Sequence, residues 1–106
     1  MSIQKTPFAL RLLRDQILYL EENASPEIAE RYIAAVETTL SFVEKEPGLG
    51  SPCHFLSPRL HGLRRWPVDG FENYLLFYQE VEEGILLLYL FHGHQDIDSI
   101  LSDPSE

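Results

Sequence analysis

The sequence predicts an α+β fold in which an N-terminal αα-hairpin packs on one face of a small antiparallel sheet of 3–4 strands. Two stretches in the first half repeat apolar residues at three- and four-residue steps, as amphipathic helices do. The second half holds aromatic and aliphatic runs separated by glycine-containing turns, which is typical of strands. A chain of 106 residues and 12.2 kDa suits a single core, so residues 1–106 are expected to form one domain.

Both helices have clear start signals in the sequence. At Thr6 a hydroxyl that can cap a helix precedes Pro7, and proline is favoured at the first helical position. Ser25 and Pro26 repeat this signal, so a second helix is expected over residues 26–45. Because only a few residues separate the two helices, they are expected to form an antiparallel hairpin.

The remainder of the chain is predicted to form a β meander. A loop rich in proline and glycine is expected over residues 47–58, and one closing helical turn over residues 96–101. The strands are expected at Leu60–Val68, Asn73–Val81 and Ile85–His92, with a further first strand at Met1–Lys5.

The two central strands carry apolar residues on both faces. Residues 74–78 and 85–91 do not alternate between apolar and polar side chains. Because a helical hairpin covers one face of a small sheet, the other face is expected to remain open. An uncovered apolar face of this kind is typical of an interaction site, either for a partner protein or for a second copy of the chain.

The charge and the hydropathy pattern exclude several classes of function. Eight basic and 17 acidic residues give a net charge of −9 and a pI near 4.8, which disfavours general binding to nucleic acids. The longest apolar run, Ile85–Phe91, is far shorter than the roughly 20 residues of a membrane helix. With one cysteine, Cys53, and no signal-peptide pattern at the start, the chain is expected to be soluble and cytoplasmic, with no membrane partner.

No catalytic, cofactor or metal site is predicted. His92, His94 and Asp96 lie close in sequence, but a His-x-His pair without a third ligand at a known spacing is a weak zinc signal. Cys53 and His54 are adjacent, which does not make a catalytic pair. The sequence also lacks the glycine-rich motifs that bind nucleotide phosphates.

Basic residues gather in the segment that ends at Trp66. Arg59, Arg64 and Arg65 supply three of the chain's eight basic residues, and His61 lies among them. On a strand, Arg64 and Trp66 would share one face while Arg65 would lie on the other. The segment could dock an anionic partner, or its arginines could pair with the abundant carboxylates of the chain itself.

Three runs of the second half and three residues of the second predicted helix resemble a known family. The runs Leu63–Val68 (LRRWPV) and Gly70–Tyr78 (GFENYLLFY) resemble the central strands of ParE toxins in the RelE/ParE superfamily. The run Leu90–Ile97 (LFHGHQDI) is similar to the HGxRDI ending of that family. Three residues of the second predicted helix fit the same pattern, namely Ala29, Arg31 and Tyr32.

The resemblance implies the toxin component of a type II toxin–antitoxin module, of the kind that stabilises plasmids and also occurs on chromosomes. It implies inhibition of DNA gyrase, neutralisation by a cognate ParD-like antitoxin, and assembly as a homodimer or as a toxin–antitoxin hetero-oligomer. The residues expected to contact a partner lie on the two strands that carry the resemblance, and they are Arg64, Arg65, Trp66, Tyr74 and Tyr78.

Two other functions are compatible with the same resemblance. The RelE branch cleaves mRNA on the ribosome, but its catalytic arginine and tyrosine correspond here to Gln95 and Leu101, which supply neither a cation nor a titrating hydroxyl. The resemblance therefore favours a protein that is not an enzyme. The third alternative is a remnant of the toxin fold whose only activity is binding to the antitoxin.

Overall fold

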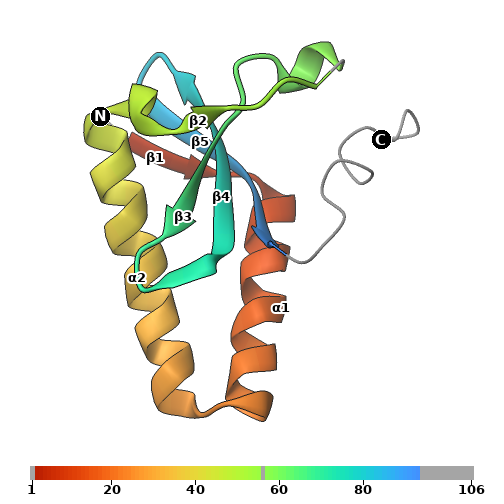
Figure 1. The fold of residues 1–106 in the computed structure, drawn as a ribbon, viewed down its shortest axis with the longest axis vertical. Helices are drawn as coiled ribbons and strands as arrows, with labels where there is room; N and C mark the ends of the chain where they lie inside the picture. The colour runs from red at the N-terminus through yellow and green to blue at the C-terminus, as the bar shows by residue number, and fades with distance from the viewer. Residues whose placement is uncertain (1, 56, 94–106) are drawn as a thin grey trace.

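Two helices lie side by side and antiparallel against a five-stranded sheet in the computed structural model, which describes residues 2–55 and 57–93 (Figure 1). The predicted α+β class and helical hairpin are confirmed. The elements follow the order β1 (Ser2–Lys5), α1 (Pro7–Asn23), α2 (Pro26–Lys45), the 3-10 helix η1 (Pro47–Leu49), β2 (Ser51–Pro52), the 3-10 helix η2 (Pro58–Leu60), β3 (Arg64–Val68), β4 (Phe71–Val81) and β5 (Gly84–His92).

Both helices begin where the sequence predicts. The Thr6 hydroxyl accepts a hydrogen bond from the backbone N–H of Ala9 at 3.0 Å, and the Ser25 hydroxyl accepts one from Ile28 at 3.1 Å. Each bond satisfies one of the free N–H groups in the first turn of a helix. Because the capping residues are local signals, the helix bounds could be predicted from sequence alone.

The sheet differs from the prediction in strand number and direction. Its strand order is β1-β5-β4-β3-β2, so there are five strands rather than three or four. The sheet is mixed rather than antiparallel, because β1 runs parallel to β5. Gly84 lies opposite Ser2 with φ +151°, and a Cβ atom there would collide with the Ser2 carbonyl group. The first strand is therefore confirmed, and its pairing needs a glycine at the start of β5.

A core lies between the helices and one face of the sheet. We call it the helix-side core, and a chain of partly buried hydrogen bonds joins α1, α2 and β5 beside it. The Tyr32 hydroxyl donates to Gln16 Oε1 at 2.6 Å, and Gln16 Nε2 donates to the Leu90 carbonyl at 2.7 Å. The buried side chains of this core are Ala9, Tyr32, Val36, Leu40, Val43, Val68, Leu76, Tyr78, Ile85, Leu87 and Leu90.

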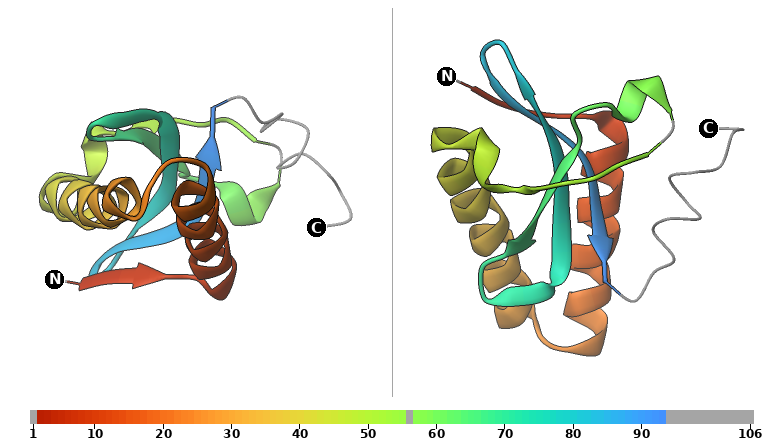
Figure 2. Two further views of the ribbon diagram at one scale, coloured as in Figure 1. Left: turned by 90° about the horizontal axis from the view of Figure 1, so that it is seen from below. Right: turned by 45° about the horizontal axis from the view of Figure 1, so that its top comes forward.

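The other face of the sheet is also covered, so the expectation of an open face was wrong. The segment between β2 and β3 folds back over the sheet with Cys53 and Phe55, while α1 adds Leu12 at the border. Figures 1 and 2 place η2 on the far side of the sheet from α2. We call the resulting group the second-face cluster, and its buried side chains are Leu60, Leu63, Phe77, Tyr89 and Phe91.

This covering segment also corrects the predicted first meander strand. Where a strand was expected from Leu60, the chain forms η2 and a turn, and β3 begins only at Arg64. The expected closing helical turn at residues 96–101 lies outside the described residues. Among the described residues, no helix is long and apolar enough to cross a membrane.

Candidate interaction surface

The register between β3 and β4 decides which way the predicted contact residues face. Arg64 pairs with Tyr78 and Trp66 pairs with Leu76, and both partners belong to the helix-side core. Arg65 pairs with Phe77, which belongs to the second-face cluster. Arg64 and Trp66 therefore share one face as predicted. That face is the one covered by the helices, because the paired residues Leu76 and Tyr78 of β4 point into the helix-side core.

Arg64 and Tyr78 hold the segment that follows α2. The Tyr78 hydroxyl donates to the Pro47 carbonyl at 2.7 Å and accepts from the Gly50 N–H at 2.9 Å. Arg64 Nη1 donates to the Gly50 carbonyl at 2.7 Å. Because a Cβ atom on Gly50 would collide with the Tyr78 hydroxyl, this clamp also requires a glycine. Burial raises the pKa of Tyr78 and keeps the phenol neutral, which preserves its role as a donor.

Both side chains of this clamp, Arg64 and Tyr78, already make contacts within the chain. Tyr78 is completely buried, so its burial argues against direct contact with a partner. Arg64 is half-buried and donates to backbone carbonyl groups rather than to the carboxylates of the chain. Arg65, by contrast, is exposed on the second face. Contact by Arg64 and Arg65 with a partner stays a prediction.

Tyr74 lies at a hollow between α1 and the ends of β4 and β5. Its ring is 4.9 Å from the ring of Tyr32 and 4.9 Å from that of His92, between ring centroids. The hollow is also lined by Gln16 and Tyr19. Partial burial, and to a lesser degree the neighbouring Tyr19, raises the pKa of Tyr74. The residue is half-buried against the helix-side core, and its remaining surface lines the hollow.

Trp66 lies half-buried on the other side of the helical hairpin, beside α2. Its ring centroid is 6.1 Å from that of Phe42, whose side chain is 54% exposed. Between α2 and β3 the surface is hollowed by about 470 Å³. We call this hollow the α2–β3 groove, and it is lined by Thr38, Thr39, Phe42, Trp66, Pro67, Asp69 and Glu72.

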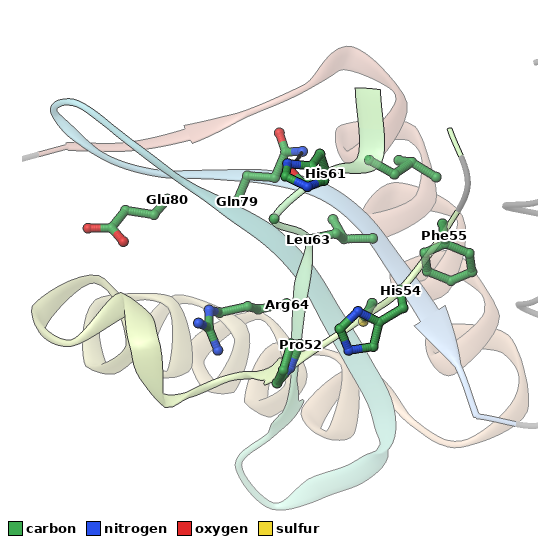
Figure 3. A pocket seen from close by; sticks show the side chains of 11 residues that line it. Pro52, His54, Phe55, His61, Leu63, Arg64, Gln79 and Glu80 are labelled. Carbon is green, nitrogen blue, oxygen red and sulfur yellow. Dashed lines mark hydrogen bonds between the residues drawn. The ribbon is translucent and has the colours of Figure 1, made fainter. Parts of the chain in front are cut away.

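A third hollow, beside the covering segment, brings together polar side chains but no catalytic arrangement. It is lined by His54, His61 and Arg64, with Glu80 at the rim. Figure 3 shows the Arg64 guanidinium pointing away from both histidines. In residues 2–55 and 57–93, no three histidine, cysteine or acidic side chains are grouped to hold a metal ion. His94, Gln95, Asp96 and Leu101 lie outside the described residues.

The sequence analysis missed Phe42 as a surface residue. Phe42 lies in α2 outside the buried stripe formed by Val36, Leu40 and Val43. An apolar residue outside that stripe could have indicated an exposed contact residue. The covering segment was missed as well, because Leu60 and Leu63 were assigned to the strand expected at Leu60–Val68, whereas the chain forms η2 and a turn there. Phe42 is therefore apolar at a helix position where a polar residue would be expected, and Leu60 and Leu63 are apolar in a segment whose non-strand structure the sequence did not reveal.

The structure is thus a small α+β domain in which a helical hairpin packs on a mixed sheet, with hollows along the hairpin. Residues 3–97 match the family described as "ParE toxin of type II toxin-antitoxin system, parDE", so the chain belongs to the ParE toxin family. Among curated protein sequences, no match was found.

Solved structures support the same fold. A chain from the "Chromosomal ParDE TA system from P. aeruginosa" superposes with a TM-score of 0.69. The match covers 87% of this chain and 95% of that chain at 15% sequence identity, which shows a shared fold. Membership of the family connects the protein to a toxin–antitoxin system and implies an antitoxin partner.

Proposed function

We propose that this protein is a toxin that inhibits DNA gyrase in the cytoplasm and that a cognate ParD-like antitoxin neutralises it. The observation that carries the proposal is the family match, which spans residues 3–97 and therefore both helices and, apart from Ser2 of β1, the five strands that the structure describes. The fold shared with a chain of a ParDE system supports it independently.

The physical character of the surface supports action through protein contacts. A chain with a net charge of −9 is repelled by DNA and RNA at long range, so a direct grip on nucleic acid is disfavoured. Exposed aromatic and apolar side chains along the hairpin, among them Tyr19 and Phe42, are the types that contribute most to protein interfaces. A protein target such as gyrase and a protein inhibitor such as an antitoxin both fit that surface.

A supercoiling assay with purified gyrase tests the proposed activity. The folded chain, added at micromolar concentration to gyrase, ATP and relaxed plasmid, is expected to reduce supercoiling, and prior mixing with its cognate antitoxin is expected to restore it. Heat-unfolded chain at the same concentration is the control for nonspecific inhibition. Full supercoiling in the presence of well-folded chain would remove gyrase as the target.

A further inference from the structure

We propose that the hollow between α1 and the ends of β4 and β5 is a binding site for a guanidinium group. The group comes either from a small free guanidine or from an arginine side chain of a polypeptide. This inference goes beyond the proposed function, because it needs neither gyrase nor an antitoxin. We call this space the Tyr74 hollow. It has a volume of about 470 Å³ and is lined by Leu12, Asp15, Gln16, Tyr19, Tyr74 and His92.

Aromatic rings reach the Tyr74 hollow from the helix and from the sheet. Tyr19 belongs to α1 and is 53% exposed, while Tyr74 and His92 belong to β4 and β5 and meet edge to face with 4.9 Å between ring centroids. The face of a tyrosine ring attracts a cation through its quadrupole. A guanidinium suits such a wall, because it is planar, delocalised and weakly hydrated and therefore stacks on aromatic faces.

The ring of Tyr74 is held in place before any ligand arrives. It packs on Tyr32 with 4.9 Å between ring centroids, and the Tyr32 hydroxyl donates to Gln16 Oε1 at 2.6 Å. Gln16 in turn donates from Nε2 to the Leu90 carbonyl at 2.7 Å. A wall that is already ordered reduces the entropy lost on binding, so even a small cation can be held here.

Asp15 supplies a negative charge at the edge of the Tyr74 hollow. Its side chain is 68% exposed, and its ion pair with the neighbouring Arg14 is long, at 3.8 Å between Nε and Oδ1. Because exposed pairs of this kind contribute little, a ligand can replace Arg14 at small cost. A guanidinium presents two parallel N–H groups to a carboxylate. A carboxylate beside aromatic rings thus favours a guanidinium over a compact ammonium group.

The charge of the whole chain decides the sign of the ligand. A net charge of −9 repels phosphates and attracts cations, which argues against a nucleotide although rings line the hollow. A hard metal ion requires several oxygen ligands. Within the part of the chain that the structure describes, no three histidine, cysteine or acidic side chains are grouped to provide them. An organic cation is the ligand that remains.

Nuclear magnetic resonance of the isotope-labelled full chain tests the site. The probe is ethylguanidinium, titrated at constant ionic strength, and ethylurea is the uncharged control of the same shape. The amide signals of Asp15, Tyr19 and Tyr74 are expected to shift and to saturate with a dissociation constant of about 1–10 mM, as suits so small a ligand. The indole N–H of Trp66, the only tryptophan, lies in the α2–β3 groove and is expected not to shift.

Two pairs of variants test the two parts of the site. Tyr19→Ala removes an exposed ring and is expected to weaken ethylguanidinium binding by roughly fivefold, whereas Tyr19→Phe keeps the ring and is expected to stay within about twofold of wild type. Asp15→Asn is also expected to cost roughly fivefold. Glu21→Gln removes the same charge from an exposed residue of α1 outside the lining, and is expected to stay within about twofold.

Three results would overturn the proposal. The first is equal binding of ethylguanidinium and ethylurea, because the site would then not recognise charge. The second is shifts that do not saturate, or that are as large at Glu82 and Glu83 of the turn between β4 and β5 as at Asp15, which is general attraction of counterions. The third is wild-type affinity in both Tyr19→Ala and Asp15→Asn.

A short peptide with one central arginine separates the two sources of the guanidinium group. Binding at least about tenfold tighter than that of ethylguanidinium assigns the hollow to an arginine side chain of a polypeptide, because the peptide then makes further contacts around the hollow. A smaller gain assigns it to a free guanidine. All of these measurements use the isolated chain, so they stand whether or not the chain inhibits gyrase.

Discussion

The two faces of the sheet are covered in different ways by the same chain. On one face, α1 and α2 pack long regular helices against β4 and β5 and seal the contact through Gln16 and Tyr32. On the other face, an irregular segment between β2 and β3 inserts Leu60 and Leu63 among the aromatic rings of the strands. The second-face cluster is nevertheless as inaccessible as the first, with every member at most 4% exposed.

The comparison shows that a short chain can cover a sheet face with an irregular segment, so the number of helices alone does not tell how many faces are covered. The covering segment is held by hydrogen bonds to β4 and β5 that involve both its backbone and a side chain. Gln79 Nε2 donates to the carbonyls of Arg59 and His61 at 2.9 and 3.0 Å, and Arg59 Nη1 donates to the Tyr89 hydroxyl at 2.7 Å. A toxin whose two faces are both filled by its own residues is expected to fold without its antitoxin, which then docks on an existing surface.

The largest expected effects come from a matched pair of adjacent residues on β4. Leu76 lies in the helix-side core and Phe77 in the second-face cluster, and both are at most 1% exposed. Leu76→Ala and Phe77→Ala are each expected to lower the free energy of unfolding by about 2–5 kcal/mol, measured by urea denaturation. A loss below about 1 kcal/mol for Phe77→Ala alone would show that the second face is not packed in solution.

A smaller effect is expected from releasing the covering segment. Gln79→Ala removes two hydrogen bonds to that segment and is expected to lower the free energy of unfolding by about 1–2 kcal/mol. Cys53 packs against the second-face cluster and is the only cysteine, so its rate of reaction with a thiol reagent should rise in the variant. Leu10→Ala is a matched control on the surface of α1. Equal thiol reactivity in wild type and Gln79→Ala would show that Gln79 does not hold the segment.

The helix-side core is also expected to respond to alkaline pH. Burial raises the pKa of Tyr32 and Tyr78 above the ordinary value of 10.0. Above pH 10 the unfolded chain loses phenolic protons that the folded chain retains, so stability is full below pH 10 and falls as the pH rises further. Urea midpoints measured at pH 8 and at pH 11 are expected to show this loss.

Tyr32→Phe tests whether Tyr32 contributes to the loss of stability at alkaline pH. The variant loses the hydrogen bond to Gln16 and is expected to be less stable at pH 8 by about 1 kcal/mol. Because one buried phenol no longer titrates, its loss of stability between pH 8 and pH 11 should be smaller than that of wild type. An identical pH dependence in the two proteins would contradict the assignment.

The smallest stability effect is expected in the α2–β3 groove. Phe42→Ser removes a side chain that is 54% exposed, so the free energy of unfolding is expected to change by less than about 0.5 kcal/mol. Urea denaturation of the variant and of wild type measures this difference. A large loss of stability would instead show that Phe42 belongs to the core.

The sequence predicts the local features of the fold and misses those that depend on distant contacts. The hydroxyls of Thr6 and Ser25 accept hydrogen bonds from backbone N–H groups three residues later in the chain, so both predicted helix starts were correct. The parallel pairing of Ser2 with Gly84 joins residues at opposite ends of the chain, and nothing near either residue specifies it. For that reason the mixed character of the sheet was not predicted.

The same reasoning applies to the candidate site. Strand alternation correctly placed Arg64 and Trp66 on one face and Arg65 on the other, but it could not say which face the helices cover. That choice follows from the pairing with Leu76 and Tyr78, which requires the register of two strands. The exposure of Phe42 beside Trp66 required the packing of α2 on β3, which no local pattern contains.

Hydrogen exchange of the isolated toxin tests most directly whether the chain covers both faces of its own sheet. The Cys53 N–H donates to the Leu63 carbonyl at 2.8 Å, and the Leu63 N–H donates to the Leu60 carbonyl at 3.1 Å. If the covering segment packs as described, both amides are protected in the absence of antitoxin, close to the level of the strand amides of β4. Exchange at the rate of an unfolded chain, slowed only when antitoxin is added, would contradict the account.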